Sequence, residues 1–372
     1  MKRLIGFLFI CVIIVVVSLI ILVSPNEEVQ QLPQIEEVVS SNIEPTEVEE
    51  IDEPAPITIE LAMIGDVLLH RDLAVYDDFG PSLQPVSEFL QASDFLVANQ
   101  ESLPVASKFG ISGYPQFSSP DYIVEDLKEV GVDLLNLANN HAVDKGEDGL
   151  AFAIENIEAQ GLPYVGAYKN SEDRSTHRIF DVEGIKIGFV SYTYGTNGLK
   201  LPTNSPYIVN YIDLEKMKSD VEAIKPLVDV TVAIIHWGNE YVTLHNDNQT
   251  YIANMMNQAG VDIIFGGHPH VLQPYEKITN SIGQDTHIFY SLGNFFSHTT
   301  SSKDTMIGGI GSFKITKENE AIVIEEPKLI ATSVILNETG RYTVYPLADV
   351  EAKSVRDLQW VKNIMGEQVI VE

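Results

Sequence analysis

The stretch VDIIFGGHPHV, residues 261–271, ends an apolar run abruptly at two glycines and two histidines. The run 261–265 is short and strongly apolar, which predicts a buried strand rather than a surface helix. The glycines allow the chain to turn tightly after the strand. Because His268 and His270 are two residues apart in an extended segment, we expect both side chains to point toward one site. Neutral imidazoles at the end of a strand suit divalent manganese, zinc or iron, and a histidine pair in a polar loop is the alternative.

Four other predicted strands also end in polar side chains. The strands and the residues that follow them are 57–64 with Asp66, 95–98 with Asn99 and Glu101, 132–137 with Asn140 and His141, and 230–235 with His236. Helical patterns lie at residues 82–92, 120–130, 146–160, 214–227 and 246–258. Strands that alternate with helices predict a largely parallel sheet covered by helices. Because ligands gather beyond the carboxyl ends of the strands in such sheets, we expect these polar residues to form one site.

The remaining patterns predict antiparallel strands. Residues 178–181 and 186–192 flank a Val-Glu-Gly turn and are predicted to form a hairpin. The other expected elements are strand-like runs at 286–292, 308–315 and 321–334, and a closing helix at 350–365. These runs indicate a second sheet or a mixed sandwich. We therefore predict an α/β fold, a mixed β-sandwich flanked by helices, in one domain over residues 58–372.

The N-terminal segment predicts a membrane anchor. Residues 4–23 are almost entirely apolar, and as a helix they would match the hydrocarbon core of a bilayer, which is about 30 Å thick. Lys2 and Arg3 precede this run, which predicts a cytoplasmic N-terminus and an extracellular domain. We expect an uncleaved, single-pass signal anchor over residues 1–25 at the cell membrane, with a cleaved signal peptide as the alternative. Cys11, the one cysteine of the chain, lies in this run, so no disulfide can form within the chain.

The charge of the chain limits its partners. Residues 26–57 hold ten acidic residues and no Lys or Arg, a composition that predicts a disordered linker. The whole chain has 53 acidic and 23 basic residues and a formal net charge of −30. This excess of negative charge argues against a nucleic-acid partner and against docking on anionic lipid. An anionic substrate would therefore have to be met by a metal ion.

The polar residues at the strand ends form a set of ligands suited to divalent metals. The set offers two carboxylates, one amide oxygen and three imidazoles: Asp66, Glu101, Asn140, His236, His268 and His270. It suits two ions about 3.5 to 4 Å apart that share a carboxylate and a hydroxide, and a single ion also fits. His141 follows Asn140 directly and has Asp144 three residues on, so it is predicted to protonate a leaving group while Asp144 orients it. The alternative for His141 is a helix cap.

At these residues the chain resembles the poly-gamma-glutamate capsule synthesis (CapA) family, whose fold is akin to that of the calcineurin-like metallophosphoesterases. The matching motifs are IGDVLLHRD at 64–72, VANQES at 97–102, LLNLANNHAVDKGEDGL at 134–150, AIIHWGNEY at 233–241, GGHPHVLQP at 266–274 and YSLGNFFS at 290–297. A single Gly-Asp pair would mean little, but six motifs in the right order make the resemblance specific. It implies a metallophosphoesterase-like fold and one or two divalent metal ions.

The resemblance also implies a role for each ligand. Asp66 matches the first metal aspartate, Glu101 the bridging carboxylate, Asn140 and His141 the asparagine ligand and adjacent acid, His236 the lone histidine, and His268 and His270 the closing G-H-x-H. Two motifs depart from the phosphoesterase pattern. Val67 and Leu68 stand where a D-x-H histidine would follow Asp66, so one histidine ligand is missing unless His70 supplies it. The second motif is Asn-Gln-Glu rather than G-D-x-x-D. The sequence therefore leaves both a single metal ion and a pair of metal ions as alternatives.

Other residues have weaker claims to a function. Those predicted to contact substrate are Asn99, Trp237, Glu240, Tyr241 and Asn294, with ordinary packing as the alternative. Asn294 is also expected to support the site from behind the ligands. Residues 111–120 predict a mobile lip that contacts substrate through Tyr114 and Phe117, or else a plain surface loop. The histidines expected at ordinary surface or edge positions are His177, His245, His287 and His298.

The resemblance implies a role in making, exporting or anchoring poly-gamma-glutamate. We expect a membrane-anchored accessory protein with a metal-dependent, hydrolase-like site. Its expected partners are the membrane, other membrane proteins of poly-gamma-glutamate synthesis and the polyanionic polymer. Two alternatives stay open: a non-catalytic scaffold or polymer-binding subunit with a structural metal, and an extracellular metallophosphoesterase unrelated to capsule.

Overall fold

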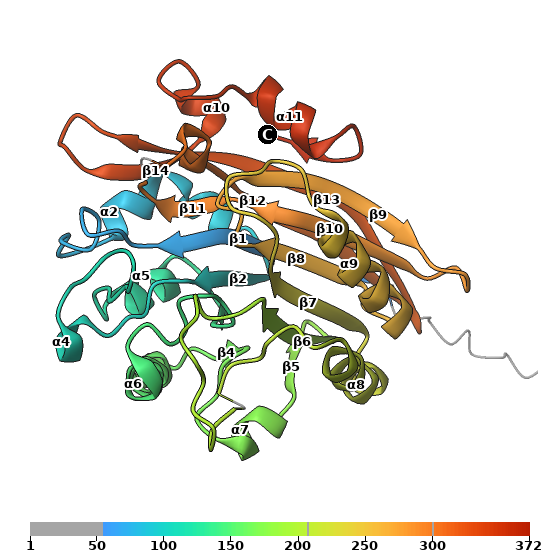
Figure 1. Ribbon diagram of the computed structural model, residues 1–372. Helices are drawn as coiled ribbons and strands as arrows, with labels where there is room; N and C mark the ends of the chain where they lie inside the picture. The colour runs from blue at the N-terminus through green and yellow to red at the C-terminus, as the bar shows by residue number, and fades with distance from the viewer. Residues whose placement is uncertain (1–54, 207, 300) are drawn as a thin grey trace, which may run out of the picture. The chain divides into compact units, whose positions relative to one another are not determined.

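The computed structural model describes residues 55–206, 208–299 and 301–372. The predicted anchor, residues 1–25, and nearly all of the predicted linker lie outside these residues. Within them, no helix combines the length and the apolar character needed to cross a bilayer. The described residues form two β-sheets with helices on their outer faces (Figure 1).

The larger sheet in the described part of the chain has nine strands. Its order is β14 (Tyr342–Pro346), β13 (Ala321–Leu336), β12 (Ile307–Glu318), β1 (Ile57–Leu68), β2 (Phe95–Gln100), β3 (Leu134–Asn136) and β4 (Tyr164–Val165), with β11 (Asn294–Ser297) beside β1 and β15 (Ile370–Val371) beside β13. The strands from β1 to β4 are parallel, and β12, β13 and β14 continue the sheet in antiparallel pairs. This sheet is therefore mixed, as predicted, and the strands expected near 308 and 321 belong to it.

The second sheet has six strands among the described residues. Its order is β5 (Arg178–Val182), β6 (Ile185–Thr193), β7 (Val230–His236), β8 (Ile263–Gly267), β10 (Asp285–Leu292) and β9 (Leu272–Thr279). The pair β5 and β6 forms the predicted hairpin, and β6, β7, β8 and β10 are parallel.

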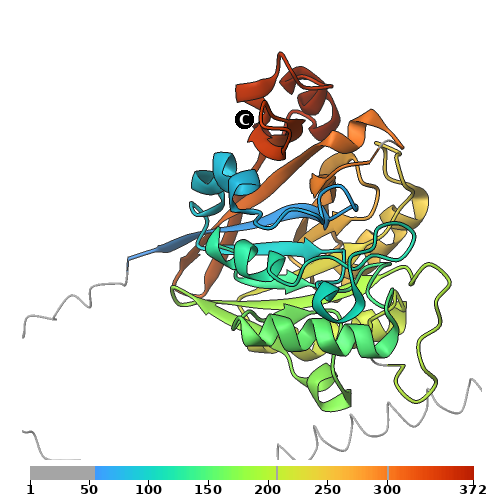
Figure 2. The same cartoon turned by 90° about the vertical axis from the view of Figure 1, so that its left-hand side faces the viewer.

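The two sheets pack face to face on a shared apolar core. Ile59 and Leu61 of β1 belong to the same buried cluster as Phe265 of β8 and Phe289 of β10. Alternate residues of each strand face this core, and the others face the covering helices. The outer face of the larger sheet packs on α5 (Ile123–Glu129) and α6 (Gly146–Ala159), the long green helix in front of the sheet in Figure 2. The mixed α/β sandwich predicted from the sequence is thus confirmed at this level.

The outer face of the smaller sheet packs on α8 (Leu214–Ile224) and α9 (Asp247–Ala259). α9 connects β7 to β8 and has strong end signals. The Asn246 side chain accepts from the Gln249 backbone amide at 3.0 Å, and the Gln249 side chain accepts from the Asn246 backbone amide at 3.0 Å. These two hydrogen bonds form a capping box. Gly260 ends the helix with a φ of 102°. β7 and β8 pair directly, with His236 opposite Gly267, which brings His236 close to the turn that carries His268 and His270.

Two predicted helices are wrong as single elements. Residues 82–92 form three short turns, α2 (Gly80–Leu83), η1 (Gln84–Val86) and α3 (Ser87–Leu90), because Pro85 cannot supply an amide to a continuous helix. Residues 350–365 split into α10 (Leu347–Val350) and α11 (Leu358–Met365), since the Asp357 side chain caps the second helix by accepting from the Trp360 amide at 2.8 Å. The other helices are α4 (Ala106–Phe109), α7 (Ser171–Ser175), η2 (Lys225–Leu227) and η3 (Lys303–Met306).

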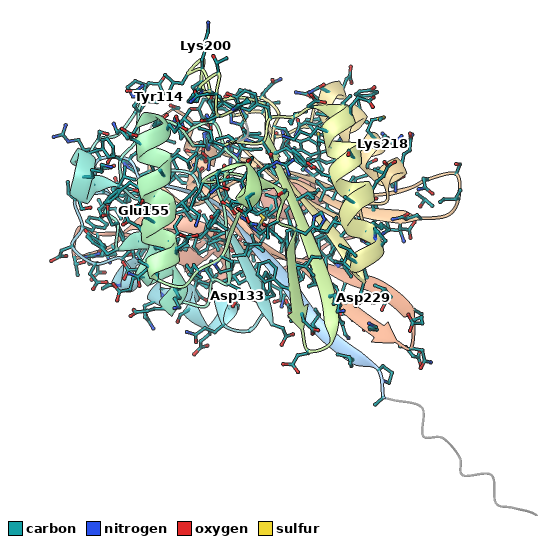
Figure 3. All side chains as sticks on the ribbon, turned by 90° about the horizontal axis from the view of Figure 1, so that it is seen from below. Tyr114, Asp133, Glu155, Lys200, Lys218 and Asp229 are labelled. Carbon is teal, nitrogen blue, oxygen red and sulfur yellow. The ribbon has the colours of Figure 1, made fainter. Side chains whose placement is uncertain are left out.

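The carboxyl ends of parallel strands from both sheets lie at one end of the molecule. Asp133 and Asp229 precede β3 and β7, and Figure 3 shows both at the end opposite to Tyr114 and Lys200. Side chains that follow these strands are therefore delivered to the Tyr114 end. The predicted ligands lie at or just after the carboxyl ends of such strands.

Candidate metal centre

The predicted carboxylate and imidazole ligands meet at the seam between the two sheets. His236 Nε2 lies 3.4 Å from Glu101 Oε1, and His270 Nδ1 lies 3.3 Å from Asp66 Oδ2. The carboxylates come from β1 and the end of β2 in the larger sheet, whereas the imidazoles come from β7 and the turn after β8 in the smaller one. All four side chains are buried. Asn140 joins them, since its Oδ1 lies 2.9 Å from His236 Nε2.

A bulge in β1 aims Asp66 into this seam. In β1, odd-numbered residues such as Met63 face the core between the sheets and even-numbered ones such as Ile64 face the helices. Regular alternation would therefore turn Asp66 toward the helices. The register with β2 shifts between Ile64 and Asp66, which reverses the alternation. Gly65 is required at this bulge because a Cβ there would lie 2.2 Å from the Gly293 carbonyl oxygen.

The two histidines after β8 are not in the extended segment that the sequence predicted. β8 ends at Gly267, and His268 and His270 have φ values of 95° and 59°. Positive φ is rare for residues with a side chain and costs free energy. The turn is held in place because the His268 amide donates to Asp66 Oδ2 at 3.2 Å. Both imidazoles still reach one site, with ring centroids 6.0 Å apart.

Several buried polar atoms of the site have no hydrogen-bond partner within the described residues. They are Oε1 and Oε2 of Glu101, Nδ1 of His236 and Nδ1 of His268. A buried carboxylate without donors costs free energy, because it has lost its water and gained no donor in exchange. Two sets of side chains place their ligand atoms within 4.8 Å of one another: Asp66, Glu101 and His270, and Glu240, His268 and His270. The two carboxylate oxygens and two imidazole nitrogens that are unpaired among the described residues are suitable ligands for a divalent metal ion.

The electrostatics of the site also favour a positive charge. Burial alone would raise the pKa of Asp66, but its hydrogen bond with His270 and the charges of His236 and His270 lower the pKa to about 2. Burial opposes a charged His270, yet Glu101 and Asp66 overcome it and raise its pKa to about 9. Burial and the neighbouring imidazoles hold the pKa of His268 well below its usual value. Without a metal ion, the two carboxylates therefore keep His270 protonated. The positive charge of that imidazole shows that this position favours a cation.

His141 and Asp144 form a buried pair beside the ligands. His141 Nδ1 lies 2.7 Å from Asp144 Oδ2, which also accepts from the Phe117 amide at 2.6 Å. The other ring nitrogen, Nε2, is left for the cleft that His141 lines. The alternative of a helix cap is wrong, because the N-cap of α6 is Lys145. The pair is arranged to hold or move a proton at Nε2.

Some of the residues predicted to contact substrate line an open cleft of about 710 Å³, and others do not. Glu240, Tyr241 and Asn294 line it together with His141 and His270. Asn294 also contacts a predicted ligand, since its Oδ1 lies 3.0 Å from His270 Nδ1.

Trp237 and Asn99 do not line this cleft. Trp237 is buried in the core with Tyr290, whose carbonyl oxygen accepts from its Nε1 at 2.9 Å. Asn99 donates to Asp66 Oδ1 at 2.7 Å and so positions a ligand. The structure therefore brings neither of these two predicted substrate contacts to the wall of the cleft.

The cleft has further lining residues, of which the sequence interpretation had raised only His70, as a possible metal ligand. His70, Arg71, Asp72 and His298 line it. Burial lowers the pKa of His70 to about 4, which leaves a neutral imidazole at the cleft wall. His298, expected at an ordinary surface position, pairs with Asp72 and lies 2.9 Å from the hydroxyl of Tyr342. For residues 70–72, the hint in the sequence was their position in the motif IGDVLLHRD, close after the Gly-Asp pair.

The predicted lip and one further histidine differ from expectation. In the lip, Tyr114 is 79% exposed, but Phe117 is buried with its ring 4.7 Å from that of His141. Phe117 therefore helps to pack the His141 ring rather than to form a free edge. His287, expected at the surface or an edge, is buried, and its Nδ1 lies 2.8 Å from the hydroxyl of Tyr275.

Comparison with known proteins agrees with the motif resemblance. The sequence profile of the family described as Bacterial capsule synthesis protein PGA_cap matches residues 60–299, which include every predicted metal ligand. The chain belongs to this family. Among proteins similar to this PGA_cap chain, the PGA biosynthesis protein CapA of Bacillus subtilis (strain 168) is 31% identical over 278 residues, 69% of this chain and 70% of that protein. The capsule biosynthesis protein CapA of Bacillus anthracis is 31% identical over 250 residues, 64% of this chain and 59% of that protein.

Solved structures of low sequence identity also resemble this PGA_cap chain in part. A hypothetical protein from Thermus thermophilus has a TM-score of 0.46 and 15% identity, and the match covers 73% of this chain and 99% of that chain. A 5'-nucleotidase precursor from the same organism has a TM-score of 0.45 and 14% identity, with 74% of this chain and 54% of that chain covered.

Proposed function

We propose that the chain is a membrane-anchored extracellular accessory protein of poly-gamma-glutamate synthesis, export or anchoring, and that it carries a metal-dependent, hydrolase-like site. One observation carries the hydrolase part of this proposal. The buried Glu101 carboxylate, with neither oxygen hydrogen-bonded within the described residues, lies against His236 and close to His270 at the seam of the sheets. Such an arrangement destabilises the ion-free fold and is compensated when a cation binds.

The residues that would hold one or two divalent ions share a position at the seam. They are Asp66, Glu101, Asn140, His236, His268 and His270, and Glu240 joins them because its carboxylate lies near the last two. A bound ion would supply an acidified water and polarise the bond under attack. Asn99 and Asn294 keep Asp66 and His270 in orientation.

His141 would supply the proton for the leaving group. Its Nδ1 is fixed by Asp144, so that Nε2 is the nitrogen available to a substrate in the cleft. Phe117 packs edge-on against the His141 ring at 4.7 Å and limits its rotation. This pair needs no change of position to reach a substrate that lies over the ligands.

The proposed location rests on the sequence of the part of the chain before the folded domain. The apolar residues 4–23 support a single-pass anchor, and the acidic residues 26–57 support a flexible tether. A coil of about 30 residues has a root-mean-square reach of roughly 30 Å. The domain could then work beside other membrane proteins that make or export the polymer.

The test is to measure metal content and turnover of the full-length chain together. We expect manganese, zinc or iron to bind and a gamma-glutamyl peptide or a generic phosphodiester to be hydrolysed. His236→Ala and His268→Ala should remove metal and turnover while the fold, followed by circular dichroism, is preserved. His177→Ala is the matched control, because His177 is exposed and is not part of the cleft.

Two outcomes would contradict the proposal. Full metal content in both histidine variants would refute the assignment of ligands. Metal and polymer binding with no turnover of either substrate would favour the scaffold with a structural metal.

A further inference from the structure

The cleft over the candidate metal centre continues into two smaller cavities. The cavity of about 710 Å³ shares Tyr114, His141 and Glu240 with a second cavity of about 400 Å³. That second cavity shares Asp144 and Leu199 with a third cavity of about 250 Å³. The three cavities therefore adjoin in a row, which we call the trough. Figure 3 shows that Tyr114, from the first two cavities, and Lys200, from the third, lie at the same end of the molecule.

The candidate metal centre opens into the first cavity of the trough. His270 and Asn294, beside the candidate metal centre, line the first cavity, and His141 lies where the first and second cavities meet. Arg71 lines the first cavity, whereas Lys200 lines the third. A ligand that reached both cations would therefore pass across His141 and continue on either side of it.

The charges along the trough suit a ligand with several negative groups. Arg71 and Lys200 are exposed, and neither forms an ion pair within the described residues. Free cations at separated points of a wall are notable in a chain with 53 acidic and 23 basic residues. Each of these two cations can attract a carboxylate of a bound ligand, and added salt weakens that attraction.

The acidic side chains of the trough are mostly compensated. Asp72 pairs with His298, and Asp144 pairs with His141. Glu240 lies in a set that could hold a metal ion with His268 and His270, so that a bound ion would neutralise it. Glu147 is exposed in the third cavity and is the carboxylate that still repels an anion there.

We propose that the trough binds an extended polymer with regularly spaced carboxylates, of the poly-gamma-glutamate type, on both sides of His141 and over the candidate metal centre. This inference rests on the proposed function and adds that the site acts on an internal bond. When an internal amide is hydrolysed, the C–N bond breaks, the hydroxyl of water goes to the carbonyl carbon and the proton goes to the departing nitrogen. The products are two shorter chains, one with a new carboxyl end and one with a new amino end.

The test compares ligands of different length on the full-length chain. A fluorescent gamma-linked glutamate decamer and the corresponding dimer are titrated by anisotropy, with metal and with a chelator, and an uncharged gamma-glutamine decamer serves as the ligand control. We expect the glutamate decamer to bind at least about tenfold more tightly than the dimer or the uncharged decamer. Arg71→Ala and Lys200→Ala should each weaken decamer binding about fivefold, and added salt should weaken it further.

Lys218→Ala is the matched control variant. Lys218 is an exposed lysine on α8, on a different part of the molecule from Lys200 in Figure 3, and its removal should leave decamer binding unchanged. Equal affinity for dimer and decamer, or equal effects of Lys218→Ala and Lys200→Ala, would overturn the trough. So would release of single glutamates from the decamer, instead of fragments of intermediate length.

These results separate the trough from the proposed function. If no metal binds and nothing is cleaved, but the decamer still binds in a length-dependent way that needs Lys200, polymer binding by the trough stands, whereas the hydrolase assignment and the cleavage of an internal bond fail. If metal binds and the dimer is cleaved as well as the decamer, the hydrolase site stands and the trough fails.

Discussion

Replacing Gly267 with alanine would disturb the candidate metal centre through a single methyl group. A Cβ at this position would lie 2.7 Å from Asp66 Oδ1 and 3.5 Å from His236 Nδ1. Because non-bonded heavy atoms are most stable about 3.5 Å or more apart, the Asp66 carboxylate would have to move by roughly half an ångström or more. It cannot move freely, since Asn99 Nδ2 holds it at 2.7 Å and the His268 amide at 3.2 Å.

The expected magnitude has two parts. Overpacking at a buried position costs about 1–3 kcal/mol in the free energy of unfolding. Displacement of a ligand by this amount should lower metal affinity about 10–100-fold, the range seen when groups that orient metal ligands are lost. Gly267 does not have a positive φ, so the backbone tolerates alanine and the effect is steric. Gly195→Ala is the control, because a Cβ there has no neighbour within 4 Å.

The assay combines calorimetric metal titration with urea unfolding of the ion-free protein. We expect Gly195→Ala to match the wild type in both, and Gly267→Ala to lose affinity as well as stability. A Gly267→Ala protein that is destabilised yet binds metal with unchanged affinity would refute the reasoning, because the methyl group would then have moved Asp66 without affecting the ion. Asp66→Asn, which changes charge but little in shape, should lower affinity in either case.

Three further predictions concern other atoms of the site. Glu101→Gln should abolish metal binding and lower the pKa of His270, because the Glu101 charge is the largest of the causes that raise that pKa. Metal analysis and a pH titration of the ion-free protein check this, and unchanged metal content would contradict it. Asp144→Asn should lower turnover about 10²–10⁴-fold with full metal content, because His141 loses the acceptor that fixes its tautomer. A loss of bound metal that matches the loss of turnover would point to a structural role instead. The pKa of His270 is raised to about 9, so a metal ion must displace the His270 proton below that pH. Metal affinity should therefore rise about tenfold per pH unit up to about pH 9. Calorimetry in buffers of different ionisation enthalpy should detect the released proton. The same proton stabilises the ion-free fold fully below about pH 6.5, and this contribution is lost as the pH rises through about 9.

The strands that deliver the ligands could be predicted from the sequence because each is an apolar run that stops at a polar residue. His236 ends β7 and Glu101 directly follows β2, as the pattern indicated. The alternation of side chains along a strand would also have excluded Trp237 from the set of residues predicted to contact substrate. His236 has the same parity as Val232 and Ile234, which face the core between the sheets, whereas Trp237 continues the opposite face with Ile235.

Other features depend on contacts between distant segments and could not be read from local patterns. The bulge at Gly65 reverses the direction of Asp66, and its cause is the carbonyl oxygen of Gly293 on a neighbouring segment. Asn294 reaches the site because β11 pairs with β1, which places it opposite Asp66. The positive φ of His268 is stabilised by a bond to Asp66, a residue far away in the sequence.

The division of ligand types between the sheets suggests what a bound ion does for the fold as well as for chemistry. The carboxylates Asp66 and Glu101 belong to the larger sheet, and His236 and His270 belong to the smaller one. In the ion-free protein, the raised pKa of His270 adds an attraction to Asp66 and Glu101 across the seam, beside the hydrogen bond from the His268 amide to Asp66. A divalent ion with ligands from both sheets would replace the proton on His270 and link the sheets directly. Its binding free energy then adds to the stability of the sandwich, in proportion to the logarithm of its free concentration over Kd. The same ion that would activate water would thus also hold together the two walls on which the ligands stand.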